Sequence, residues 1–324
     1  MTRFYFTIDT EYEAGHAMRH GKAGRAENFT RSICGRTDAG DVGIFYQMDM
    51  FDRCGLKGVF FIDPMPALLW GTAAIADIVG PVVERGHDVQ LHIHTEWLDL
   101  AGSANPLGSR RGTNIKDFHF EDQCVLIDWA RAQLQAAGAP RPLAFRAGNY
   151  GANDDTLRAL AELGFTHDSS HTPGMAGSAC EISLGPDHRR PMDHLGITEV
   201  PIGCVGDVIT GLRHAQLTAL SLVELVAAAR HAMDAGLADF TLVSHSFELL
   251  CRDRRRINKI VRRRFDLFCQ ALAAMEGIET ACFTMNPPKP GSADSLRPAL
   301  PPSAMRNGSR MAEQAVSNML YGSG

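Results

Sequence analysis

The sequence predicts an α/β fold, a distorted parallel (β/α) barrel of seven or eight strands, and two observations lead to it. Short apolar segments typical of strands alternate with longer segments of helical apolar spacing from Arg3 to Phe283. Polar side chains follow the same end of several of these strands, where parallel barrels carry their functional groups. A barrel also closes a parallel sheet without exposed edges. We therefore expect one barrel domain over residues 1–285.

Each element is predicted from its own apolar pattern. Residues 3–9 alternate aromatic with polar residues, and residues 58–63 are an apolar run of strand length. Ile44, Met48 and Phe51 have helical spacing. Further strands are expected within 86–97 and at 143–145, 165–168, 197–202, 239–245 and 278–283. Helices are expected at 41–54, 72–85, 121–136, 154–163, 221–233 and 257–275.

Two segments lack a regular apolar period. Residues 12–40 are rich in Gly, Arg, Lys and His, which predicts a long loop of the kind that can serve as a lid. The cations between Arg19 and Arg36 could hold an anionic sugar, although nothing in their spacing requires it. Residues 286–324 form a Pro-, Ser- and Gly-rich tail, which we expect to be flexible and outside the barrel, with a short helix at 311–321.

Composition limits the partners and the location. The formal net charge of −5 gives no reason to expect nucleic-acid binding, which needs a clustered basic surface. Neither a signal peptide nor a transmembrane segment is expected, so a cytoplasmic location is predicted. Residues 252–264 carry seven arginines and one lysine. A solvated surface is their ordinary interpretation, and contact with phosphate or an anionic membrane surface is the alternative.

A histidine pair lies on one of the expected strands. Within residues 86–97, apolar residues alternate with Gln90, His92 and His94, so both imidazoles point to the same face. Imidazole is a common ligand of zinc and similar ions, and Glu96 adds a carboxylate two positions on. A pair of buried, hydrogen-bonded histidines is the alternative interpretation.

Ionisable side chains follow other expected strands at the same end. In chain order these residues are Asp9, Glu11, Arg146, Asp168 and His245. Any one of them could be a capping or surface group. A shared position at one end of the barrel favours a common functional site instead.

These residues give the sequence a resemblance to the polysaccharide deacetylase family, also called the NodB-homology or carbohydrate esterase 4 group. The family's Thr-Phe-Asp-Asp-Gly motif is similar to residues 7–11, and its His-Ser/Thr-x-x-His motif is similar to residues 92–96. Its third motif, an arginine followed by a turn and an aromatic residue, resembles residues 146–151. Its Asp-Ser segment resembles residues 168–170, and its closing Leu-x-x-His resembles residues 242–245.

The first two motifs depart from the family at the metal site. Thr10 stands where the family has an aspartate ligand, and Glu96 stands where it has a second histidine. The resemblance implies a divalent metal ion, with zinc expected, held by Glu11 and His92 together with His94 or Glu96.

The resemblance also implies a reaction. A metal-dependent hydrolase would remove an N-acetyl group from a sugar or glycan, with Asp9 as the base toward metal-activated water and His245 as the acid. Arg146 would orient Asp9. Trp97 and Tyr150 are expected to stack on a sugar ring, with core packing as the alternative. Hydrolysis of a different amide on the same barrel and a metal-free glycan-binding protein are the alternative functions.

Overall fold

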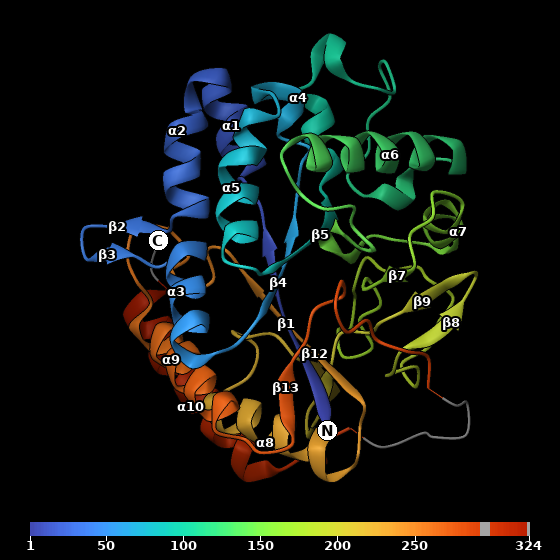
Figure 1. Cartoon of the computed structure of the whole chain (residues 1–324). Helices are drawn as coiled ribbons and strands as arrows, with labels where there is room; N and C mark the ends of the chain where they lie inside the picture. Colours follow the sequence, from blue (N-terminus) through green and yellow to red (C-terminus); the bar gives the residue numbers. More distant parts are fainter. Residues whose placement is uncertain (292–298, 323–324) are drawn as a thin grey trace.

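The computed structural model describes residues 1–291 and 299–322, and in this part of the chain a nine-stranded sheet forms the centre of the molecule (Figure 1). Its strands are β1 (Thr2–Thr10), β4 (Gly58–Ile62), β5 (Asp88–Ile93), β6 (Ala144–Ala147), β7 (His167–Asp168), β8 (Met192–His194), β9 (Ile197–Glu199), β12 (Asp239–His245) and β13 (Ile278–Thr280). The order is β12-β1-β4-β5-β6-β7-β9-β8, and β13 also pairs with β1. Neighbouring strands are parallel except β8 and β9. The predicted distorted parallel barrel is confirmed, with the sheet curled into a half-barrel.

The longer helices lie around the outside of this sheet (Figure 1). Six of them connect the strands, namely α3 (Ile44–Cys54), α5 (Ala73–Glu84), α6 (Phe120–Ala136), α7 (Asp154–Glu162), α8 (Leu222–Asp234) and α9 (Lys259–Ala273). Each lies inside, or one residue beyond, the segment predicted for it. The structure adds a short helix, α4 (Ala67–Trp70), and a hairpin of β10 (Cys204–Asp207) and β11 (Gly211–His214). Across the described ranges, no helix has the length and apolar character needed to cross a membrane.

The alternation of side chains along β1 separates two cores. Phe4 and Phe6 belong to the large core beneath the helices, whereas Tyr5 belongs to a smaller core inside the curled sheet. Because successive strand residues point to opposite faces, Thr7 and Asp9 point the same way as Tyr5. The interior of the half-barrel is therefore apolar at the amino-terminal end of β1 and polar at the carboxyl-terminal end.

Irregular backbone lies along the free edge of β12. The N–H of Gly203 donates to the carbonyl of Thr241 in β12 at 2.9 Å. The N–H of Val243 in β12 donates to the carbonyl of Ala215 at 2.9 Å, and its carbonyl accepts from the N–H of Leu217 at 3.0 Å. These bonds satisfy edge groups that would otherwise be available for pairing with another chain. They also hold residues 203–217 beside the strand that ends in a predicted site residue.

Residues 12–40 are largely helical, so the prediction of a long loop is wrong. They form α1 (Ala14–His20), α2 (Arg25–Asn28), a π-helical turn (Phe29–Ile33) and a hairpin of β2 (Arg36–Thr37) and β3 (Gly40–Asp41). The side chain of Asn28 donates to the carbonyl of Glu13 at 2.8 Å and accepts from its N–H at 2.9 Å. Helices this short depend on such tertiary contacts and carry no apolar period for a sequence pattern to detect.

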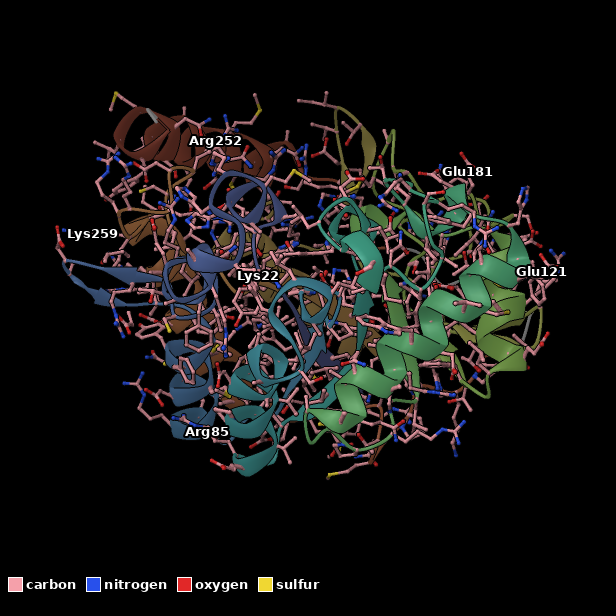
Figure 2. All side chains as sticks on the ribbon, turned by 90° about the horizontal axis from the view of Figure 1, so that it is seen from above. Lys22, Arg85, Glu121, Glu181, Arg252 and Lys259 are labelled. Atoms are coloured by element: carbon pink, nitrogen blue, oxygen red, sulfur yellow. The ribbon has the colours of Figure 1, made fainter. Side chains whose placement is uncertain are left out.

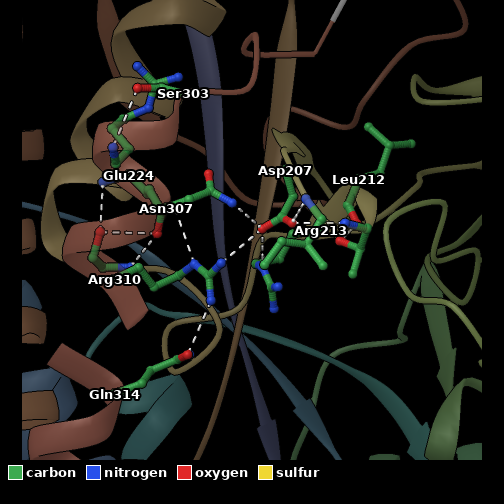
Figure 3. Close-up of polar contacts among 12 residues, drawn as sticks. Asp207, Leu212, Arg213, Glu224, Ser303, Asn307, Arg310 and Gln314 are labelled. Atoms are coloured by element: carbon green, nitrogen blue, oxygen red, sulfur yellow. Dashed lines mark hydrogen bonds and ion pairs between the residues drawn. The ribbon is translucent and has the colours of Figure 1, made fainter. Parts of the chain in front are cut away.

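The C-terminal helix α10 runs from Ala304 to Tyr321 and packs on the rest of the protein (Figure 3). The helix predicted at 311–321 is present and begins earlier, at Ala304. Its packing contradicts the prediction that the tail lies outside the fold, and residues 292–298 and 323–324 of the tail lie outside the described residues. Arg310 donates to Asp207 at 2.9 Å and to Glu224 at 3.3 Å, and all three side chains are buried. These contacts are polar, so the apolar pattern of the tail sequence gives no sign of them.

Candidate active site

Asp9 and Arg146 form a buried ion pair at the carboxyl-terminal ends of β1 and β6. Nη1 of Arg146 donates to Oδ1 of Asp9 at 2.5 Å and to the hydroxyl of Thr7 at 2.9 Å. Its Nε donates to the carbonyl of Ser169 at 3.1 Å, and its Cζ lies 4.2 Å from the ring centre of Phe61. A guanidinium held by this many contacts has a single position, so it fixes the orientation of the Asp9 carboxylate.

Glu11, His92 and His94 form a group that could hold a metal ion. One possible ligand atom from each residue lies within 4.8 Å of the others. Nε2 of His92 lies 3.6 Å from Oε2 of Glu11, and Nε2 of His94 contacts the same oxygen. Glu11 follows β1, and the two histidines lie at the end of β5. The structure thus brings together three of the four predicted ligands.

Each imidazole of this group is oriented through its other ring nitrogen. Nδ1 of His92 lies 2.8 Å from the carbonyl oxygen of Arg146, and a carbonyl only accepts, so Nδ1 carries the proton. Nδ1 of His94 lies 3.2 Å from Oε2 of Glu96. Partners of this kind orient metal-binding histidines in proteins. His94 and Glu96 were the two alternatives for the third ligand. His94 lies beside Glu11, whereas Glu96 contacts the opposite side of the His94 ring.

The donor set fits a divalent metal ion. Two imidazole nitrogens and one carboxylate oxygen are ligands that zinc prefers, and three protein ligands leave one position open. Burial favours the neutral form of Glu11, but the imidazoles of His94 and His92 lower its pKa well below the usual range. Burial likewise disfavours charge on His94, but Glu11 and Glu96 raise its pKa well above the usual range. A metal ion would compete with that proton for the same nitrogen.

Asp63 is an ionisable residue of this site that the sequence analysis missed. It directly follows β4, is fully buried, and accepts from the N–H of Met65 at 3.0 Å. Among the described residues its Oδ2 has no hydrogen-bond partner. Burial raises its pKa to about 7, although the charges of His94 and His92 act in the opposite direction. An acid at the end of a strand was a signal that could have identified it.

His245 faces the site from β12, on the other side of β1. The two strands are paired so that Asp9 and His245 are register partners. Nδ1 of His245 lies 3.1 Å from Oε2 of Glu248. Burial alone lowers the pKa of His245, but the hydrogen bond and charge of Glu248 raise it to about 9. Glu248 in turn accepts from Nε2 of Gln216 at 2.9 Å and from the N–H of Thr218 at 3.1 Å. No sequence pattern indicated that Glu248, Gln216 and Thr218 lie here.

Asp168, a predicted strand-end acid, has local partners instead of a place in the metal group. Its carboxylate accepts from the N–H and the hydroxyl of Ser170 at 2.8 and 2.9 Å. It also neighbours the buried Glu199, whose pKa is raised well above the usual range by burial and by the charge of Asp168. This acid pair lies behind Arg146, whose charge acts on both carboxyl groups.

The two predicted sugar-stacking residues differ in their environments. Trp97 is fully buried and packs edge-on against Trp70, with ring centres 5.2 Å apart. The stacking prediction is therefore wrong for Trp97, and the core-packing alternative holds. Tyr150 is 9% exposed, and its hydroxyl has no hydrogen-bond partner within the described residues. Burial and the charge of Asp9 raise the pKa of Tyr150, and its contact with substrate stays a prediction.

Comparison with protein-family models and with curated protein sequences finds no match for this chain. Among solved structures, a Mycobacterium smegmatis protein assigned as a polysaccharide deacetylase is similar with a TM-score of 0.55 at 16% identity, over 92% of this chain and 95% of that chain. The chain has the fold of the polysaccharide deacetylases. A 4-alpha-glucanotransferase from Thermococcus litoralis matches with a TM-score of 0.50 at 12% identity, over 88% of this chain and 40% of that chain.

In this deacetylase fold, the ionisable residues that followed strands in the sequence meet at the carboxyl-terminal end of the half-barrel. Along the sheet, Asp9 ends β1 and Arg146 reaches it from β6, on the far side of β5. Glu11, His92 and His94 lie toward β5, and His245 lies toward β12. The arrangement offers one metal-binding group, one fixed carboxylate and one imidazole whose Nδ1 is engaged by an acid.

Proposed function

We propose that the protein is a metal-dependent hydrolase that removes an N-acetyl group from a sugar or glycan. The observation that carries the proposal is the position of Asp9 between a three-residue metal-binding group and His245. Hydrolysis of an amide needs a base toward water, an acid toward the leaving nitrogen and stabilisation of negative charge on the carbonyl oxygen. The three parts of this site match those three needs.

Glu11, His92 and His94 are the residues that would hold the metal ion. Zinc is the ion that we expect from two imidazoles and one carboxylate. When bound, a divalent ion makes water a stronger acid and stabilises charge on a carbonyl oxygen. Glu96 acts on the site by orienting His94 through its Nδ1.

The remaining residues move protons. The Asp9 carboxylate, fixed by Arg146, takes the proton from the attacking water. His245 delivers a proton from Nε2 to the leaving nitrogen, since its Nδ1 faces Glu248. The raised pKa of about 9 keeps His245 protonated at neutral pH, as a general acid requires.

Acetate release tests the proposal directly. A panel of N-acetylated sugars, sugar nucleotides and chitooligosaccharides would be incubated with the protein, with and without a chelator. We expect acetate from at least one class, lost with chelator and restored by added metal. Release of a different acid from other amides would favour the alternative amide substrate. A purified chain that binds no divalent ion would favour the metal-free glycan-binding protein and contradict the proposal.

A cytoplasmic location and the domain boundary at residue 285 stay predictions.

A further inference from the structure

The arginine-rich segment 252–264 does not form one basic surface. Arg264 is buried and pairs with Glu313 of α10 at 2.6 Å. Arg255 is exposed to solvent. Arg254 is different from both, because its side chain is only 18% exposed and lies over the ring of Phe247. The predicted solvated surface therefore describes only some of these arginines.

Arg254 lies one aromatic ring away from the proposed acid. Its Cζ is 3.7 Å from the ring centre of Phe247, a distance at which a guanidinium and an aromatic face attract. The ring of Phe247 in turn packs on the ring of His245, with centres 5.4 Å apart. Arg254 also has a φ of +54°, which is uncommon for a residue other than glycine and occurs often at functional sites.

The groups around Arg254 neutralise it incompletely. Its Nη1 donates to the hydroxyl of Ser32 at 2.9 Å, but the nearest oxygen of Glu13 is 3.5 Å away. Glu13 is also engaged by Arg19 at 3.1 Å. A strong guanidinium–carboxylate pair has contacts of about 2.7–2.9 Å. Glu13 therefore serves two arginines and forms a tight pair with neither.

A second arginine lies next to this one. Nη2 of Arg31 donates to the carbonyl of Asp253 at 3.5 Å, and its Nη1 is 4.0 Å from Glu27. The Nε of Arg31 is buried without a hydrogen-bond partner in the part of the chain that the structure describes. The pKa of Arg254 is lowered, mainly by burial, and the positive charge of Arg31 lowers it further, whereas the charges of Glu13 and Glu11 act in the opposite direction. Two cations are thus held side by side with loose acidic partners.

We propose that Arg254 and Arg31 form a subsite for an anionic group, a phosphate or a carboxylate, carried by the N-acylated substrate. The proposal rests on the hydrolase function above and names its substrate class. Planar guanidinium groups bind such oxyanions through paired hydrogen bonds. Figure 2 views the molecule from above and places Lys22 near the middle of this view, with Glu121 and Glu181 at its right edge.

Matched substrates test the subsite. A neutral N-acetylated sugar would be compared with the same sugar carrying a phosphate and with one carrying a carboxylate, and kcat/KM would be measured for each. We expect the native protein to prefer at least one anionic form, and the form preferred identifies the group. Arg254→Ala should lower that preference about tenfold or more through KM, with little effect on the neutral sugar. Arg31→Ala should act in the same direction.

Two variants control for an effect on folding. Arg255→Ala removes an exposed arginine from the same segment and should leave the preference unchanged. Arg254→Lys keeps the charge but loses the planar donors, so it should retain only part of the preference. An equal kcat/KM for neutral and anionic sugars in the native protein would overturn the inference. An unchanged preference in Arg254→Ala would overturn it as well.

A binding measurement separates this inference from the proposed function. Inorganic phosphate should raise the melting temperature of the native protein and of Arg255→Ala, and raise that of Arg254→Ala much less. Any phosphate bound elsewhere, including at a metal, contributes equally to both variants. If no sugar releases acetate but phosphate discriminates between the variants, the reaction is wrong and the subsite stands. If acetate is released but phosphate stabilises both variants equally, the subsite is wrong and the reaction stands.

Discussion

Glu11, His92 and His94 on one side of the site are held by strand ends and their nearest neighbours, whereas His245 on the other side depends on separate segments. The metal-binding side needs only the pairing of β1, β4 and β5 and two contacts, from the Arg146 carbonyl and Glu96. The acid side needs Glu248 after β12 and residues 216–218 beside it. The position of the first group therefore follows from the sheet, and that of the second depends on packing farther away.

The support of the acid side extends to the C-terminal helix. Thr218 donates to Glu248, and the carbonyl of the preceding Leu217 accepts from Nη1 of Arg264 at 2.7 Å. Nη2 of the same arginine donates to Glu313 of α10 at 2.6 Å. A continuous set of polar contacts thus joins α10 to the carboxylate that contacts His245. Changes in α10 should affect the acid side and leave the metal-binding side intact.

The largest expected effect concerns the metal-binding side. His92→Ala should remove bound metal, and Glu11→Ala nearly so, because each change deletes one of only three ligands. His94→Ala should weaken metal binding more than Glu96→Ala. Glu96→Ala removes only a residue that orients His94, which should lower metal affinity about 10–100-fold. Metal content and metal titrations of the four purified variants measure this order. Greater loss in Glu96→Ala than in His94→Ala would show that their roles are reversed.

Asp9→Asn should abolish turnover and leave metal content unchanged. The amide keeps the size of the side chain but cannot take a proton from water. Acetate release and metal content measured on the same sample separate the two effects. Loss of metal in Asp9→Asn together with its retention in Glu11→Ala would exchange the proposed base and ligand.

Arg310→Met should destabilise the protein without changing its metal affinity. The change leaves Glu224 and Asp207 buried without this cation, which costs about 3–5 kcal/mol for a broken buried pair. The contacts of α10 contradict the expectation of a flexible tail outside the barrel, so truncation after Met285 should lower the melting temperature by several degrees. Met305→Ala, at an exposed position of the same helix, is the control. An unchanged melting temperature in Arg310→Met would mean that the contacts of Arg310 do not stabilise the fold.

The same contrast between the two sides explains what the sequence could predict. Strand alternation and strand ends predicted the parallel barrel and the common position of Asp9, Glu11, Arg146 and the two histidines, because these depend on the period and pairing of strands. The roles of these residues came from the family resemblance. Asp63 was accessible by the same rule and was overlooked. Glu248 and the anchors of α10 lie in irregular or polar segments, where residue spacing carries no information about tertiary partners. Trp97 was misassigned because proximity in sequence to His94 does not determine which way a side chain points.

The smallest effect is expected on the acid side. It should change the pH dependence of kcat and leave metal binding on the other side unchanged. The pKa of His245 is raised from 6.5 to about 9, so the contact with Glu248 stabilises the fold fully below pH 6.5 and is lost as the pH rises through about 9. In Glu248→Gln the pKa of His245 should fall, because the charge is gone and burial still disfavours the imidazolium. The high-pH decline of kcat should then move to lower pH while metal content stays unchanged. Glu276→Gln, at an exposed position, is the control. A decline that stays near pH 9 in Glu248→Gln would assign the proton donor to another residue.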